Sequence, residues 1–112
     1  MAENKRYITQ AQENGNVMIS EDVIATIVAH AAQEVEGVVS LHTRKSWGGK
    51  DMKINIAEDN ALTIDCNLVV QYGYSVLDLA KSAQVAITSA IESMVGVKVA
   101  QVNVNVYRIA RQ

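Results

Sequence analysis

The feature that most constrains the fold is a pair of segments in which apolar and polar residues alternate. The first covers residues 52–56, the second covers residues 62–72, and the polar turn Glu58-Asp59-Asn60 joins them. Successive side chains of a strand point to opposite faces, so this pattern predicts an antiparallel hairpin with one apolar face. That face carries Met52, Ile54, Ile56, Leu62, Ile64, Cys66, Leu68, Val70 and Tyr72.

A first helix is predicted between Ser20 and Gly37. Serine caps free backbone N–H groups, and Glu21 and Asp22 follow where the helix dipole favours negative charge. Gly37 is predicted to end the helix, because glycine adopts the left-handed conformation readily. The apolar stripe contains Val23, Ile24, Ile27, Val28, Ala31 and Val35.

A second helix is predicted from Ser75 to about residue 95. Ser75 and Asp78 form a capping box with aspartate in place of glutamate, and Gly96 stops the helix. Much of its inner stripe is alanine, which favours close approach to a neighbour. The stripe contains Val76, Leu79, Ala80, Ala83, Ile87, Ala90, Ile91 and Met94.

Three further strands are expected at residues 17–19, 38–43 and 97–109. In the last strand the apolar positions change from odd to even numbers, which predicts a bulge or kink near Ala100-Gln101. Residues 1–15 are polar and aperiodic, and they predict a flexible tail with at most a short extended stretch at residues 7–9. Residues 16–112 then form one domain.

The resulting order is β-α-β-β-β-α-β, and it predicts an α+β fold. Each helix has one apolar stripe and the hairpin has one apolar face, so the economical assembly is a two-layer sandwich. Both helices pack on one face of a small, mostly antiparallel sheet. The other face is expected to carry Lys53, Asn55, Asp65, Asn67, Gln71, Asn103 and Asn105.

Charge and composition argue against several function classes. The net charge is −2, whereas a domain that binds nucleic acid through phosphates normally has a basic surplus. The single cysteine excludes an internal disulfide and a thiolate metal cluster. No apolar run reaches the length of a membrane span and no leader pattern is present. We therefore expect a cytoplasmic protein that reaches a membrane only through another protein.

No catalytic constellation is recognisable in the sequence. His30 lies at the edge of the first apolar stripe and His42 in a strand, and neither has the spacing of a metal-ligand pair. Cys66 falls on the apolar face of its strand, where a thiol is unreactive. We therefore predict that the protein is not an enzyme and has no catalytic, cofactor-binding or metal-binding residues.

The loop at residues 45–50 is the segment with the least obvious structural role. Its glycines precede a strand rather than a helix, so it does not resemble a phosphate-binding loop. Trp47 either folds back over the edge of the core, contacts a protein partner or lies at a lipid surface. The candidate partner contacts are Arg44, Lys45, Trp47 and Lys50 in or next to this loop, Asn55, Asn67, Asn103 and Asn105 on the polar sheet face, and Val85 on the outer side of the second helix.

Several motifs carry a family resemblance over residues 15–110. They are Gly15-Asn16-Val17-Met18-Ile19-Ser20, Ala31-Ala32-Gln33-Glu34-Val35-Glu36-Gly37-Val38, Gln71-Tyr72-Gly73, Val95-Gly96-Val97 and Val102-Asn103-Val104-Asn105-Val106. In this order and spacing they resemble the alkaline-shock-protein (Gls24-like) envelope stress response family of Gram-positive bacteria.

The resemblance implies a small cytoplasmic α+β protein without established enzymatic activity or cofactor. Some members of that family self-associate and are held at the membrane by a separate anchor protein. The expected function is a non-enzymatic scaffold or adaptor in the envelope or general stress response, with a homo-oligomer and a membrane-anchor protein as partners. The alternatives are an RNA-binding module and a small regulatory domain. The segment before the hairpin is shorter here than in many relatives, so another member's partner need not apply to this chain.

Overall fold

Strand β5 (Leu62–Gln71) is the centre of the fold in this computed structural model, which describes residues 7–43 and 49–111. One edge of β5 pairs antiparallel with β4 (Met52–Ile56) over residues 62–66. This pairing confirms the predicted hairpin.

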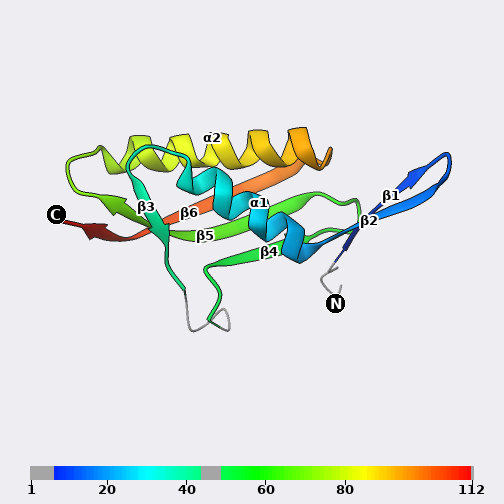
Figure 1. The fold of residues 1–112 in the computed structure, drawn as a ribbon, viewed down its shortest axis with the longest axis horizontal. Helices are drawn as coiled ribbons and strands as arrows, with labels where there is room; N and C mark the ends of the chain where they lie inside the picture. The colour runs from blue at the N-terminus through cyan, green and yellow to red at the C-terminus, as the bar shows by residue number, and fades with distance from the viewer. Residues whose placement is uncertain (1–6, 44–48, 112) are drawn as a thin grey trace.

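Two more strands complete the sheet around β5 (Figure 1). Strand β3 (Val38–Leu41) continues along the same edge as β4 and pairs antiparallel with residues 68–70. Strand β6 (Val99–Ala110) pairs parallel with β5 along its other edge. The sheet is therefore three strands wide along its whole length: β6 and β5 are joined first by β4 and then by β3.

Strand β6 contains two bulges. Leu62 pairs with Val99 and Thr63 with Gln101, so Ala100 is looped out. This register shift confirms the bulge predicted near Ala100-Gln101. A second shift leaves Tyr107 between the pairs formed by Leu68 and Val69, and no local pattern predicted it.

Helices α1 (Glu21–Gln33) and α2 (Val76–Met94) lie on the same face of the sheet (Figure 1). The hydroxyl of Ser20 accepts the N–H of Val23 at 3.3 Å, and that of Ser75 accepts the N–H of Asp78 at 3.4 Å. Both predicted N-caps are thus confirmed, as is the two-layer α+β sandwich.

Helix α1 ends earlier than the sequence predicted. Gln33 is its last residue and Glu34 its C-cap, whereas the prediction placed the end at Gly37. Beyond the helix the chain forms turns. In these turns the N–H of Val35 donates to the carbonyl of Ala32, and the N–H of Val38 donates to the carbonyl of Val35. Gly37 has φ +100° and directs the chain from these turns into β3.

The first described residues differ from the predicted tail. Strand β1 (Tyr7–Gln12) pairs antiparallel with β2 (Gly15–Ser20), which confirms the strand expected at residues 17–19 and adds one before it. The side chain of Ile8 is fully buried, and the Gln10 amide donates to the carbonyl of Val95 at 3.1 Å. These contacts with distant residues order residues 7–12, and polar composition gave no sign of them.

The core lies between the sheet and the two helices. Four of the residues expected there are exposed. Tyr72 lies just beyond the end of β5, and the other three, Val23, Val76 and Met94, lie at helix ends or beside the buried stripe. Within residues 7–43 and 49–111, no helix has the length and apolarity needed to cross a membrane. The largest fully buried side chains include Ile8, Ile24, Val28, Leu62, Ile64, Leu68, Val70, Ile87 and Ile91.

Candidate protein-interaction surface

The outer side of β6 is the candidate interaction surface. In a parallel pair, alternate residues of a strand direct their N–H and C=O groups to the same neighbour. The carbonyls of Lys98 and Ala110 accept N–H groups of Leu62 and Tyr72, which fixes this alternation at both ends of β6. With the two bulges taken into account, Val102, Val104, Val106 and Ile109 direct their backbone groups away from β5. We call these backbone groups the β6 edge.

Helix α2 covers only the beginning of this side of the strand. The Gln84 amide donates to the carbonyl of Val102 at 3.0 Å, and a Glu92 carboxylate oxygen accepts the N–H of Val99 at 3.3 Å. In the described part of the chain, no other strand pairs with β6 beyond β5. An unpaired edge of this kind is a template for strand addition.

The sheet face opposite the helices is polar next to the β6 edge. Asn103 donates to a carboxylate oxygen of Asp65 at 2.8 Å, and Gln101 donates to the side-chain oxygen of Asn103 at 3.0 Å. Asp65 and Asn103 are also register partners, so this network holds β5 and β6 together across the face. Asn105, the next residue of β6 on the same face, is exposed.

Two rings meet on the same polar face. The imidazole of His42 and the phenol ring of Tyr107 stack with centroids 3.8 Å apart and planes 11° from parallel. His42 follows β3 and donates its N–H to the carbonyl of Asn67, whereas Tyr107 is the bulged residue of β6. The pair therefore bridges β5 from both sides, which explains why Asn67 and Val69 are only 2% and 3% exposed.

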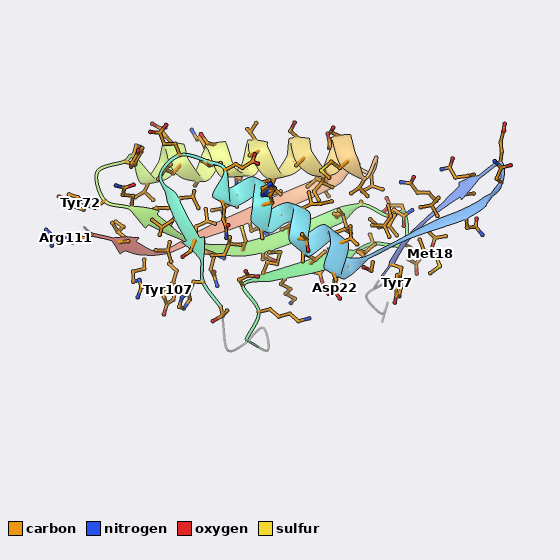
Figure 2. All side chains as sticks on the ribbon, in the orientation of Figure 1. Tyr7, Met18, Asp22, Tyr72, Tyr107 and Arg111 are labelled. Carbon is orange, nitrogen blue, oxygen red and sulfur yellow. The ribbon has the colours of Figure 1, made fainter. Side chains whose placement is uncertain are left out.

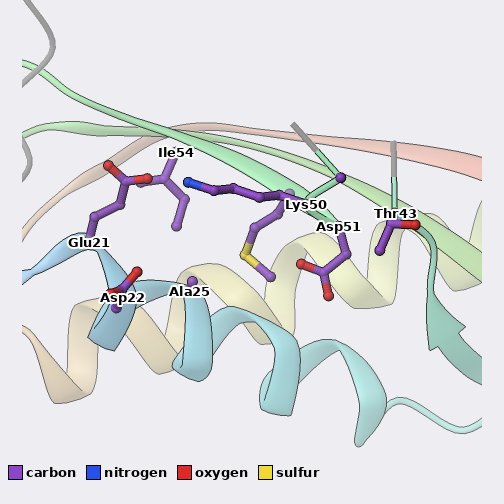
Figure 3. Close-up of a pocket in the computed structure, with 9 residues that line it drawn as sticks. Glu21, Asp22, Ala25, Thr43, Lys50, Asp51 and Ile54 are labelled. Atoms are coloured by element: carbon purple, nitrogen blue, oxygen red, sulfur yellow. The ribbon is translucent and has the colours of Figure 1, made fainter. Parts of the chain in front are cut away.

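Lys50 lies in a different part of the molecule. It lines a pocket of about 350 Å³ between the start of α1 and β4. The carboxylates of Glu21 and Asp22 line the same pocket, and the Lys50 side chain extends towards Glu21 and Ile54 (Figure 3). Acidic and basic groups thus share one small pocket, whose surface charge is mixed.

The predicted contact residues are divided among three places. Asn55, Asn67, Asn103 and Asn105 lie on the polar sheet face, although Asn67 is covered by the stacked rings and presents almost no surface. Val85 is 69% exposed on α2, and Lys50 lines the pocket beside α1. Arg44, Lys45 and Trp47 lie outside the described residues.

Sequence reasoning did not find the β6 edge or the ring stack. The edge consists of backbone groups, and its location depends on which strand pairs with β6. His42 and Tyr107 are far apart in sequence, and the bulge that turns Tyr107 onto the polar face has no local signal. The alternation Val102-Asn103-Val104-Asn105-Val106 was the one visible sign of an extended strand here.

The two ends of the molecule also expose apolar and aromatic side chains. Tyr72, Tyr107 and Arg111 lie at one end, and Tyr7 and Met18 lie on the β1–β2 hairpin at the other (Figure 2). The Arg111 guanidinium carbon is 5.3 Å from the centre of the Tyr72 ring. Such rings with an adjacent cation are suited to protein contacts.

The structure shows the surroundings of Cys66 and His30, two of the side chains weighed above as reactive groups. Burial raises the pKa of the Cys66 thiol to about 12, and the negative charges of Asp65 and Asp51 add to this. His30 forms an exposed pair with Glu34 at 3.2 Å, one helical turn away. Across the described ranges, no three His, Cys, Asp or Glu side chains are grouped in a way that could hold a metal ion.

Comparison with known proteins gives one family. The sequence model of the alkaline shock protein 23 family, described as having a cell envelope-related function, matches residues 9–111. This match confirms the resemblance indicated by the sequence motifs. The Streptococcus pyogenes protein Spy1535 is 31% identical over 105 residues, covering 88% of this chain and 81% of that protein. The Bacillus subtilis protein YqhY is 30% identical over 105 residues, covering 85% and 77%. Both are named as uncharacterized proteins.

Solved structures of similar fold include variants of the MamM CTD. One aligns with a TM-score of 0.54 at 14% identity, covering 79% of this chain and 94% of that chain. A zinc form aligns with a TM-score of 0.52 at 13% identity, covering 82% and 86%. At this level of identity the likeness shows the shared α+β fold alone.

Proposed function

Because this chain belongs to the alkaline shock protein 23 family, we propose that it acts in the envelope stress response as a non-enzymatic scaffold or adaptor. In this role it self-associates and binds a membrane-anchored protein from the cytoplasmic side. The family match supports the link to the cell envelope, and the surface of the molecule supports the binding role.

The observation that carries the proposal is the unpaired β6 edge. Natural proteins usually protect such edges with charges, prolines, short strands or covering elements. Here β6 has 12 residues, and α2 makes side-chain bonds only to backbone groups of Val99 and Val102. A long edge with valines at its centre favours pairing with another protein strand.

Exposed apolar side chains on both layers add to this surface. Leu77 and Val85 on α2 and Ile109 on β6 are all exposed. Scattered apolar residues are ordinary on a protein surface, but here they accompany an open strand edge. Recruitment by an anchor protein follows from the family resemblance and supplies the membrane contact.

Light scattering on the purified protein over a wide concentration range tests self-association. We expect the average mass to rise above that of one chain as concentration increases. Cross-linking in cells followed by membrane fractionation tests recruitment, and we expect the chain to be recovered with membranes in a cross-link-dependent way. A strict monomer at high concentration that also stays out of the membrane fraction would contradict the proposal.

A further inference from the structure

The centre of β6 is symmetric in sequence. Residues 102–106 read Val-Asn-Val-Asn-Val, the same in both directions about Val104. In an antiparallel strand pair, residues directly opposite each other lie on the same face. If two copies pair about Val104, Val102 lies opposite Val106 of the second copy and Asn103 lies opposite Asn105. Valines then meet on the core side and asparagines on the polar face.

The backbone groups match in the same arrangement. Val102, Val104 and Val106 all direct their N–H and C=O groups outward, so pairing about Val104 places outward groups opposite outward groups. If the register of the two β6 strands were shifted by one residue, outward-directed backbone groups of one strand would lie opposite inward-directed groups of the other. Valines would then lie opposite asparagines. An axis at Asn103 would leave Val106 opposite the bulged Ala100, and only the axis at Val104 engages all three valines.

The helical layer fits the same axis. Gln84 bonds to Val102 and Glu92 to Val99, so α2 runs opposite to β6. Two residues along a strand correspond to about four along a helix, so counting from Gln84 places the axis near Ala80 and Lys81. Leu77 and Val85, 64% and 69% exposed, lie four residues to either side of Lys81. A two-fold axis there brings Leu77 of one copy towards Val85 of the other.

From these three observations we infer that β6 pairs antiparallel with β6 of a second copy, across a two-fold axis at Val104. The inference rests on the proposed self-association and specifies its surface and register. The two sheets become one continuous sheet, and the Gln84 amide releases the carbonyl of Val102 to the second copy. An interface of this type is self-complementary and closes as a dimer.

A proline substitution tests the pairing directly. The N–H of Val104 points away from β5, so Val104→Pro removes no bond of the sheet within one chain. We expect it to raise the dimer dissociation constant at least about tenfold, because it deletes donors at the axis. Ile109→Pro is the matched control, since its N–H also points outward but lies beyond the Tyr107 bulge. Circular dichroism checks that both variants are folded.

A cysteine pair gives a second, independent readout. In a Cys66→Ala background, Val104→Cys places two thiols opposite each other at about 5.5 Å between Cα atoms, a separation that a disulfide spans. Ile109→Cys would place them about 30 Å apart. We expect mild oxidation to cross-link the Val104→Cys variant into a covalent dimer. The Ile109→Cys variant should remain uncross-linked.

The outcomes separate this inference from the proposed function. If the wild type associates but Val104→Pro associates equally well and Val104→Cys does not cross-link, the β6 pairing is wrong and the scaffold role stands. If the wild type remains a monomer at all concentrations, the β6 pairing is wrong too, and the membrane-recovery result then decides whether an adaptor role survives.

Discussion

Cys66 lies at the middle of β5 with its side chain fully buried on the apolar face. A thiol loses its hydration there, so the neutral form is favoured and the pKa is raised from 9.0 to about 12. Asp65 and Asp51 act in the same direction through their negative charge. The residue expected from sequence to be unreactive is therefore held in its unreactive protonation state.

This shift predicts a loss of stability at alkaline pH. The folded state keeps the thiol proton to higher pH than the unfolded chain. The stability contributed by the buried neutral thiol is therefore complete below the ordinary pKa of 9.0 and is lost as pH rises towards 12. The slope for one proton is at most about 1.4 kcal/mol per pH unit. Urea unfolding between pH 8 and 10.5 should show a shallower decline for Cys66→Ala than for the wild type.

Tyr74 is the internal control for that experiment. Its hydroxyl donates to a Glu36 carboxylate oxygen at 3.1 Å, and this bond raises the pKa of Tyr74. Tyr74→Phe removes the tyrosine contribution and leaves that of Cys66. Equal pH slopes for the wild type and Cys66→Ala, in the presence or absence of Tyr74, would show that the thiol does not titrate with unfolding.

At the scale of elements, the connection from α1 to β3 depends on Gly37. A Cβ at this position would lie 2.8 Å from Leu79 Cδ2 and 3.1 Å from the ring of Tyr74. The backbone also has a positive φ, which disfavours any residue with a side chain. Gly37 thus allows both the turn and the approach of β3 to the beginning of α2.

Comparing Gly37→Ala with Gly73→Ala separates these two effects. Gly73 has a similar φ of +106°, but a Cβ there meets no atom within 4 Å. We expect Gly73→Ala to lower the free energy of unfolding by about 1 kcal/mol through backbone strain alone. Gly37→Ala should cost about 1–2 kcal/mol more because of the crowding. Equal losses in urea unfolding would mean that Leu79 and Tyr74 move aside freely.

At the scale of the whole molecule, stability is unevenly distributed. Strand β5 is paired on both edges and almost entirely buried, whereas the β1–β2 hairpin extends away from the body (Figure 1). Ile8 is buried where the hairpin joins the core, but residues 11–16 near its tip are exposed. An isolated two-stranded hairpin is marginally stable in water.

Hydrogen exchange should reveal this difference. We expect amides of β5 to exchange only through global unfolding, and those of residues 11–16 to open with a free energy of at most about 2 kcal/mol. Val104→Pro, which removes the proposed pairing of β6, should leave the opening free energy of residues 11–16 unchanged. Protection of residues 11–16 equal to that of β5 would indicate that a partner covers the hairpin.

Local sequence determined the elements whose signals come from neighbouring residues. The hairpin of β4 and β5, the caps at Ser20 and Ser75 and the bulge at Ala100 follow from periodicity and short-range hydrogen bonding. The asparagines of β6 were correctly assigned to the polar face for the same reason. These features need no knowledge of the distant chain.

Tertiary structure alone decided which groups form the candidate surface. The parallel pairing of β6 with β5 determines which valines direct backbone groups outward, and the stacking of His42 on Tyr107 covers Asn67. Strand β1 is likewise held by contacts of Ile8 and Gln10 with distant residues. Pairing partners are chosen by packing of the whole chain, because the same backbone can bond to any strand that the core brings beside it.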